Sequence, residues 1–236
     1  TGDFDGYWGI WDEPFLQYMS GVLSETPQPF FASVFTLTSH HPFVVPDRYA
    51  GILPEGKTKV HRGVAYTDLA LRRFMETSGR EAWFRNTIFV FVADHVSSET
   101  FAPKTLTPTG NSHIVCLLYT PDGALRGKSA ETVQQIDLMP TLLGLLGYGK
   151  PYFAFGRDVF READTPAMAV NAMNENYQAI TDSLVLFFDG ERTLSAFLRS
   201  DTLQRHDVSD QRTPQLETAE RELKARLQQY YRHVSK

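Results

Sequence analysis

The sequence predicts an α/β fold in which a sheet is flanked by helices and followed by a small C-terminal α+β appendage. Apolar runs at 30–37, 88–92 and 114–119 lack strict polar alternation, which is typical of strands buried on both faces. An amphipathic segment separates the first two runs. The 236 residues suffice for one sizeable domain with an appendage.

The first elements are a helix and a strand. Asp12, followed by Glu13 and Pro14, is typical of a helix N-terminus, and we expect a helix of about twelve residues. After a proline-rich break, the run at 30–37 predicts a buried strand. This strand leads directly to His40 and His41.

The next segments predict a crossover. Apolar residues at helical spacing indicate a helix from Tyr66 to about Gly79, and a strand at 87–93 follows it. A right-handed crossover makes two such strands parallel, so their carboxyl ends are expected on the same edge of the sheet. Asp94 and His95 directly follow the second strand.

The remaining elements complete the chain. A polar loop at 96–112 leads to His113 and a third strand, and a helix is expected at 130–146, where Pro140 requires a kink or a helix start. Beyond residue 164, an Asp-Gly turn between apolar runs indicates a β-hairpin. Thr213 and Pro214 then begin a final amphipathic helix.

Composition excludes several classes of protein. A net charge of −5 without a Lys/Arg cluster argues against a nucleic-acid partner. The single cysteine, Cys116, lies in an apolar run and is expected to be a buried thiol. No apolar stretch has the length of a membrane span, and the start has no signal-peptide pattern. The chain opens without Met in an aromatic-rich segment, which predicts a fragment of a longer protein.

Chemistry-bearing side chains gather at predicted strand ends. These positions are His40 and His41 after the first strand, Asp94 and His95 after the second, and His113 before the third. A carboxylate and an imidazole suit Zn²⁺ or Mn²⁺, and further imidazoles can neutralise or protonate an oxyanion. The pattern therefore favours a metal or phosphate-handling site.

Six segments carry a resemblance to a known family. They are, in order, WGIWDEPF, FTLTSHHPF, YTDLALRRF, IFVFVADH, SHIVCLLYTP and QQIDLMPTLLGLLG. Together they resemble the sulfatase branch of the alkaline phosphatase superfamily, and within it the lipoteichoic acid synthase-like phosphoglycerol transferases. The resemblance covers about residues 7–160. It implies that residues 1–163 are the C-terminal part of a sulfatase-like catalytic domain and residues 164–236 its appendage.

The resemblance also implies roles for individual residues. Asp94 and His95 match the Asp-His pair that binds one divalent ion, Mn²⁺, Mg²⁺ or Zn²⁺. His40 matches the histidine that contacts the phosphoryl group. His41, its neighbour, is the second candidate for this contact. His113 matches a position where a histidine of some relatives approaches the metal. Members commonly have glycine before the Asp-His pair and often after it, whereas this chain has Ala93 and the β-branched Val96, which restrict the backbone of this loop more than glycine does.

The family's Thr or Ser nucleophile and its other acidic ligand precede the matched region, so the full-length protein is expected to be the enzyme and this fragment alone inactive. Implied substrates are phospholipid headgroups or phosphoglycerol units. The implied location is the extracytoplasmic face of a bacterial inner membrane, with tethering through an upstream segment.

Two other functions remain open. One is a non-catalytic sulfatase-fold domain with a lipid-binding or regulatory role. The other is a plain α/β binding module with solvated histidines, for which Asp94→Ala leaves the metal content unchanged. Tyr7, Trp8 and Trp11 resemble a sugar-stacking platform only in composition, and we expect such dense aromatics to lie in the core.

Overall fold

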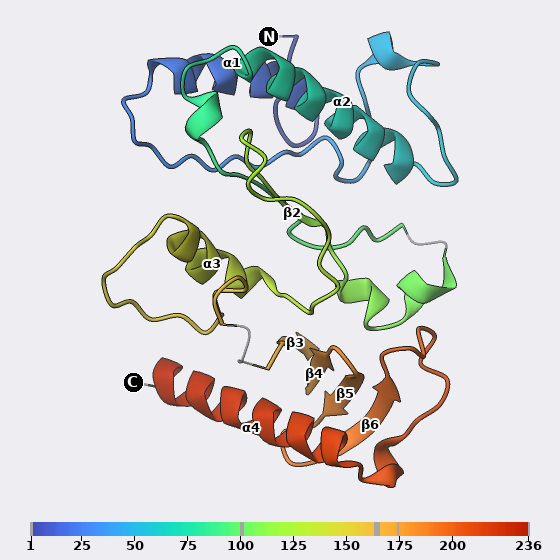
Figure 1. Cartoon of the computed structure of the whole chain (residues 1–236). Helices are drawn as coiled ribbons and strands as arrows, with labels where there is room; N and C mark the ends of the chain where they lie inside the picture. Colours follow the sequence, from blue (N-terminus) through green and yellow to red (C-terminus); the bar gives the residue numbers. More distant parts are fainter. Residues whose placement is uncertain (1, 100–101, 163–165, 174, 236) are drawn as a thin grey trace. The chain divides into compact units, whose positions relative to one another are not determined.

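The computed structural model describes residues 2–99, 102–162, 166–173 and 175–235. The chain forms two compact units, shown in Figure 1. The first unit comprises Thr1–Ala102 and His113–Gly127, and the second comprises Pro103–Ser112 and Lys128–Lys236. The domain boundary expected after residue 163 stays a prediction.

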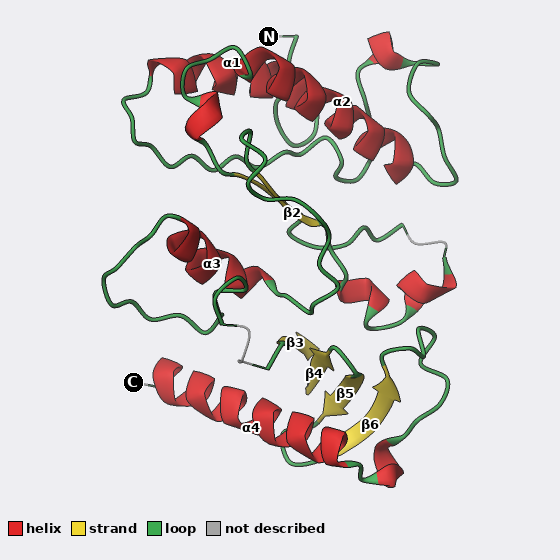
Figure 2. Cartoon of the chain, in the orientation of Figure 1, coloured by secondary structure: helices red, strands yellow, loops and turns green. Residues whose placement is uncertain are grey.

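Two helices and a two-stranded ribbon make up the first unit. Helices α1 (Asp12–Glu25) and α2 (Val60–Ser78) pack against each other, and strands β1 (Phe89–Val92) and β2 (Cys116–Tyr119) form an antiparallel pair (Figure 2). Short 3₁₀ turns lie at Asp47–Tyr49 and Phe84–Asn86. The helices and the ribbon share a core of mainly aromatic and aliphatic side chains, namely Leu16, Leu23, Ala70, Phe74, Trp83, Phe84 and Phe89.

The second unit is an antiparallel meander covered by a helix. Strands β3 (Met168–Met173), β4 (Asn176–Thr181), β5 (Leu184–Phe188) and β6 (Thr193–Leu198) are hydrogen-bonded in that order. Helix α4 (Pro214–Val234) contacts β5 and β4. The shared core contains Met168, Ala179, Leu184, Leu186, Phe188, Ala196, Leu216, Ala219 and Leu223.

The predicted hairpin and final helix are confirmed. The connection between β5 and β6 has Gly190 at φ 105°, a conformation that favours glycine, and Asp189 Oδ1 accepts the amides of Glu191 and Arg192. Thr213 caps α4 by accepting the amide of Leu216. Helices α1 and α2 were also predicted, although α2 begins six residues before Tyr66.

Three predictions about the elements are wrong. Residues 30–37 form no strand, and Phe31 is 88% exposed. The predicted helix at 130–146 is reduced to a 3₁₀ turn at Gln135–Asp137 and α3 (Leu138–Leu145), in which Pro140 stands in the first turn as a helix start permits. Cys116, expected to be buried, is exposed at the start of β2.

The remaining short elements are 3₁₀ turns at Pro103–Leu106, Gly110–Ser112 and Ser209–Gln211. In the second unit, the amide side chain of the fully buried Gln178 holds the loop before His113 to the meander. Its Oε1 accepts from Asn171 Nδ2 at 2.9 Å and from Ser112 Oγ at 3.4 Å. Thr109 accepts a hydrogen bond from Gln204 at 2.8 Å. Among the described residues, no helix has the length and hydropathy needed to cross a membrane.

Candidate active site

The Asp-His pair lies at the end of the ribbon. Strand β1 ends at Val92, and the ladder extends by one bond, from the amide of Ala93 to the carbonyl of Val115 at 3.1 Å. Asp94 and His95 follow immediately, with side chains that are 53% and 66% exposed. Both donor side chains are therefore accessible to a ligand from solution.

The contacts of His95 define how its ring is presented. Its Nδ1 lies 2.6 Å from the carbonyl oxygen of Val96. A carbonyl oxygen only accepts, so Nδ1 carries the proton and the lone pair of the neutral ring is on Nε2. That Nε2 lies 3.5 Å from Asp94 Oδ2, while Asp94 Oδ1 accepts the amide of His95.

These contacts fit a divalent cation. A carboxylate oxygen is a ligand for Mn²⁺, Mg²⁺ and Zn²⁺, and an imidazole nitrogen is a ligand that Zn²⁺ in particular prefers. A hydrogen bond from Nδ1 to a backbone carbonyl is the usual way in which proteins orient a ligating histidine. Asp94 and His95 thus present a carboxylate oxygen and an imidazole nitrogen 3.5 Å apart on exposed side chains.

His113 lies at the same end of the ribbon. It is exposed and stands three residues before Cys116, the partner of Val92 in the antiparallel register. The sequence placed His113 before the third strand without assigning it to an edge, and the antiparallel pairing of β1 and β2 brings it to the end of the ribbon where Asp94 and His95 lie. In the part of the chain that the structure describes, no three His, Cys, Asp or Glu side chains form a metal-binding group.

His40 and His41 lie in a loop fixed by the N-terminal segment. Trp8 Nε1 donates to the carbonyl of His41 at 2.6 Å, and the Trp8 ring meets the His40 ring edge-on with centroids 4.3 Å apart. His40 Nδ1 lies 3.0 Å from the carbonyl oxygen of His41, so Nδ1 donates there and the lone pair is on Nε2. Both histidines are exposed. The expected shared edge with the Asp-His pair rested on a strand at 30–37, which is absent from the structure.

The buried carboxylate of Asp12 holds this loop to the helices. Asp12 Oδ1 accepts the amides of Leu37 and Thr38, both at 3.0 Å, and Oδ2 accepts the Thr67 hydroxyl at 2.7 Å. Thr38 Oγ1 in turn accepts the amide of Asp12 at 3.1 Å. One 1%-exposed side chain therefore ties the segment before His40 to both α1 and α2.

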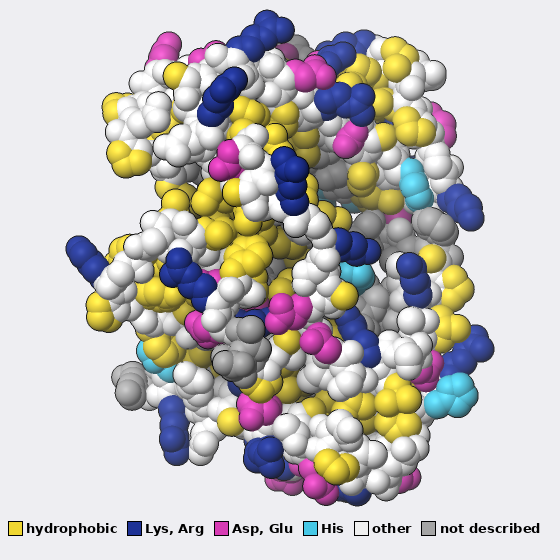
Figure 3. All heavy atoms as spheres, in the orientation of Figure 1, with side chains coloured by type: hydrophobic (Ala, Val, Ile, Leu, Met, Phe, Trp, Pro, Cys, Tyr) yellow, Lys and Arg dark blue, Asp and Glu magenta, His cyan; other side chains and the backbone are white. Residues whose placement is uncertain are grey.

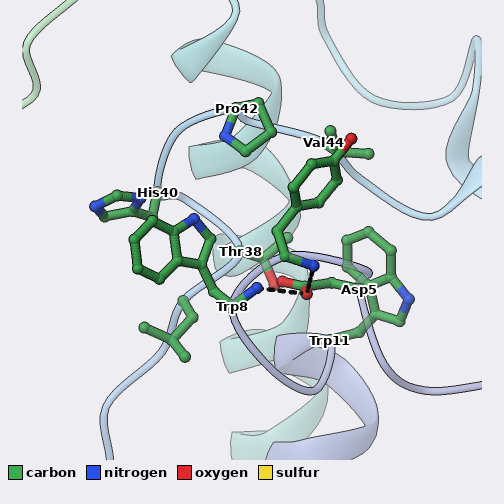
Figure 4. Close-up of a pocket in the computed structure, with 9 residues that line it drawn as sticks. Asp5, Trp8, Trp11, Thr38, His40, Pro42 and Val44 are labelled. Carbon is green, nitrogen blue, oxygen red and sulfur yellow. Dashed lines mark hydrogen bonds between the residues drawn. The ribbon is translucent and has the colours of Figure 1, made fainter.

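A small cavity lies beside His40, and Figure 4 shows the Trp8 ring against the imidazole at its margin. Its volume is about 10 Å³, close to the space that one water molecule needs. Asp5 shapes the turn beneath it, because Asp5 Oδ1 accepts the amides of Tyr7, Trp8 and Gly9. The cavity has room for no more than about one water molecule.

Sequence reasoning missed the two residues that position His40. Trp8 was expected in the core but is 54% exposed, and Tyr7 is 61% exposed. Asp12 was interpreted as the N-cap of α1, whereas it is the first helical residue and its carboxylate reaches other segments. Both roles depend on tertiary contacts, for which the local sequence offers no signal.

The comparisons with known proteins agree with the sequence resemblance. Residues 1–148 match the sulfatase family. The chain is 29% identical to lipoteichoic acid synthase-like YvgJ of Bacillus subtilis over 181 residues, which is 67% of this chain and 29% of that protein. It is 26% identical to the lipoteichoic acid synthase of Staphylococcus aureus over 169 residues, 64% of this chain and 26% of that protein. The chain therefore aligns with under a third of the length of these relatives.

Solved structures support the same fold. A protein of the alkaline phosphatase superfamily from Vibrio parahaemolyticus matches 82% of this chain and 48% of its own, with 27% identity and a TM-score of 0.68. The putative sulfatase yidJ from Bacteroides fragilis matches 92% of this chain and 57% of its own, with 20% identity and a TM-score of 0.69. The predicted α/β fold of sulfatase type is thus confirmed, and the chain belongs to the sulfatase family.

Proposed function

We propose that this chain supplies part of the active site of a metal-dependent enzyme that acts on phosphodiester headgroups. The enzyme is a phosphoglycerol (phosphoalcohol) transferase or a sulfatase-like hydrolase. The observation that carries the proposal is the end of the ribbon, where antiparallel pairing brings Asp94, His95 and His113 to the same edge within the sulfatase match. The likeness to lipoteichoic acid synthases favours a phosphoglycerol-type substrate.

Each site residue has a separate task in this proposal. Asp94 and His95 hold one divalent ion, Mn²⁺, Mg²⁺ or Zn²⁺, with His113 as a further ligand. The bound ion supplies positive charge that stabilises a phosphoryl oxyanion. His40 contacts the phosphoryl group through Nε2, because its Nδ1 faces the carbonyl of His41, and His41 flanks it.

The nucleophile is a Thr or Ser from a part of the protein outside this chain, as is the second acidic metal ligand. The chain alone is therefore inactive. Its partner is a phospholipid headgroup or a phosphoglycerol unit, not a nucleic acid. The protein works at the extracytoplasmic face of a bacterial inner membrane, to which a segment outside this chain tethers it.

Metal content of the full-length protein tests this proposal. We expect Asp94→Ala to lower the bound Mn²⁺ or Zn²⁺ by at least about tenfold after dialysis, in keeping with the loss of a direct ligand. Asp210→Ala, which alters an exposed aspartate of the second unit, is expected to leave metal content unchanged. Elemental analysis by mass spectrometry gives both values, and unchanged metal in Asp94→Ala would contradict the proposal.

A second candidate is a sulfatase-fold domain without catalysis, in a lipid-binding or regulatory role. Ala93 and Val96 favour it, since a β-branched residue beside the Asp-His pair restricts the loop where the family has glycine. Full-length protein supplied with Mn²⁺ and a fluorescent phosphatidylglycerol analogue distinguishes the two. Turnover supports the enzyme, whereas headgroup binding without turnover supports the second candidate.

A further inference from the structure

An exposed aromatic cluster lies in the second unit. It comprises Phe153, Phe155, Tyr230, Tyr231 and His233, hereafter the aromatic patch. The ring of Phe153 stacks on that of His233 at 4.0 Å with an interplanar angle of 7°, and Phe155 meets Tyr230 at 5.3 Å. Phe153 is 50% exposed, Tyr230 46% and Tyr231 49%. The rings of Phe153, Tyr230 and Tyr231 thus pack against neighbouring rings while about half of each side chain is exposed.

The patch continues the core stripe of α4. Along this helix Leu223 is fully buried, Leu227 is partly buried, and Tyr230 and Tyr231 are exposed. The spacing keeps these residues on one face. Over the last turns the loop after α3 adds Phe153 and Phe155 to that face. The core stripe thus turns into an outward-facing aromatic surface.

The loop adds further exposed apolar side chains. Tyr148 and Tyr152 form a ring pair at 6.1 Å and are each 46% exposed, while Leu146 is 70% exposed. Figure 3 shows hydrophobic side chains gathered along the loop that follows α3, at the left of the view, with basic and histidine side chains beside them. A group of exposed apolar side chains beside basic residues is the kind of surface through which soluble proteins bind partners or membranes.

The two segments that form the patch carry basic residues and no acidic ones. Residues 146–157 and 225–235 contain no Asp or Glu, although the chain as a whole carries −5. Lys150 and Arg232 are exposed, and neither forms an ion pair with any residue that the structure describes. An aromatic surface whose two segments carry Lys and Arg but no Asp or Glu is suited to an anionic partner.

We propose that the aromatic patch, with Lys150 and Arg232, is a docking surface for an anionic phospholipid bilayer. Tyrosine rings are enriched at the boundary between headgroups and acyl chains, where the ring is apolar and the hydroxyl meets water. Lys and Arg beside them are attracted to anionic headgroups. The Tyr231 hydroxyl is hydrogen-bonded to the Tyr177 hydroxyl, so this polar group of the patch has a partner within the protein.

This inference goes beyond the proposed function and does not depend on it. The patch contains none of the proposed metal or phosphoryl ligands, and bilayer binding requires no metal. Vesicle assays are therefore carried out without divalent cations. A failure of bilayer binding leaves the metal proposal intact, and a failure of metal binding leaves this one intact.

The test is co-sedimentation of the 236-residue chain with lipid vesicles. One set is phosphatidylcholine alone, and in the other about a third of the lipid is phosphatidylglycerol, which gives a negative surface potential. We expect binding to the anionic vesicles at least about tenfold above binding to the neutral ones, weakening as salt is raised. Equal binding to both sets would overturn the proposal.

Two double variants locate the surface. Phe153→Ser with Tyr230→Ser removes two rings, and we expect at least a tenfold lower partition coefficient. The control, Phe31→Ser with Phe35→Ser, alters apolar residues of the first unit that are 88% and 62% exposed. We expect it to bind as the unaltered chain does. An equal loss in both variants indicates unspecific adhesion through exposed apolar surface and would overturn the proposal.

A charge variant keeps the rings in place and so separates docking from folding. Lys150→Glu with Arg232→Glu is expected to abolish the preference for phosphatidylglycerol. Arg199→Glu with Arg205→Glu makes the same change in net charge at exposed positions outside the patch, and it is expected to keep the preference. Loss of the preference in both variants shows a response to net charge alone and would overturn the proposal.

Soluble glycerol phosphate separates a bilayer from a free anion. Added at the same phosphate concentration, it is expected to leave vesicle binding unchanged, because the rings need an apolar layer to enter. Displacement of the chain by glycerol phosphate identifies a small-anion site instead and overturns the bilayer proposal.

Discussion

The carboxylate of Glu13, at the start of α1, gathers donors from two other segments of the first unit. Its Oε2 accepts the Tyr49 hydroxyl at 2.5 Å and Arg48 Nη2 at 2.8 Å, and its Oε1 accepts from Arg73. The side chain is 12% exposed. Burial raises the pKa of the Glu13 carboxyl, but the hydrogen bonds from Tyr49, Arg48 and Arg73 outweigh it and hold that pKa below its usual value.

This lowered pKa predicts how stability depends on pH. A carboxyl whose pKa is lower in the folded state stabilises the fold above its unfolded pKa of about 4.3, and this contribution is lost as pH falls through the folded pKa. We expect Glu13→Gln to lower the free energy of unfolding by about 1–3 kcal/mol at neutral pH. The difference from the unaltered chain should shrink in acid, below the pKa of the folded state.

Urea unfolding followed by tryptophan fluorescence measures this effect at neutral and acid pH. Glu76→Gln, at an exposed position of α2, is the control and is expected to leave the unfolding free energy unchanged at both. A deficit in Glu13→Gln that stays constant across this range would mean that the carboxylate charge contributes nothing.

At the scale of single residues, the sequence pattern predicted some residues of the candidate site and not others. Asp94 and His95 stand out because two polar residues end an apolar run, and the structure places them at a strand end. Trp8 and Asp12 gave no such signal. Their roles arise from contacts more than twenty residues away along the chain, which spacing does not encode.

At the scale of elements, helix α4 begins with an N-cap that the Thr213-Pro214 pair predicts from the sequence. Thr213 accepts the Leu216 amide, and Pro214 occupies the first helical position. Thr213→Ala leaves that amide without its partner, so we expect a loss of about 1 kcal/mol in the free energy of unfolding. Thr213→Ser keeps the hydroxyl and should retain most of the stability. Chemical unfolding of the three proteins checks this, and equal loss in both variants would show that the methyl group matters rather than the cap.

Elements with local signals were predictable, and those defined by partners were not. α1, α2, α4 and the β5–β6 hairpin have periodicity, caps or an Asp-Gly turn. The run at 30–37 has the composition of a strand, but a strand exists only when another chain segment supplies its hydrogen bonds. β3 and β4 were missed for the converse reason, since the small and polar residues of β3 resemble a loop until the meander pairs them.

At the scale of the whole molecule, each compact unit has a buried cluster of its own. Leu186 is fully buried in the second unit, and Phe74 is 4% exposed in the first. We expect Leu186→Ala to cost about 2–5 kcal/mol, through lost burial and a cavity, and Phe74→Ala about 3–5 kcal/mol. Because the clusters are separate, each loss should be confined to one unit.

Hydrogen exchange measured by mass spectrometry tests this separation. Leu186→Ala should reduce amide protection in β4, β5 and α4 while α1 and α2 stay protected, and Phe74→Ala should do the reverse. If either substitution lowers protection evenly along the described chain, the two units unfold as one cooperative body.

The ribbon of β1 and β2 separates the position of Asp94 and His95 from the length of the connection that follows them. Asp94 and His95 leave the ribbon where His113 returns to it, so the chain between them departs from and comes back to one place. Lengthening or shortening that excursion keeps the strand register, and the entropic cost of a longer loop grows only slowly. A change in the length of that connection is therefore compatible with Asp94 and His95 staying at the end of β1.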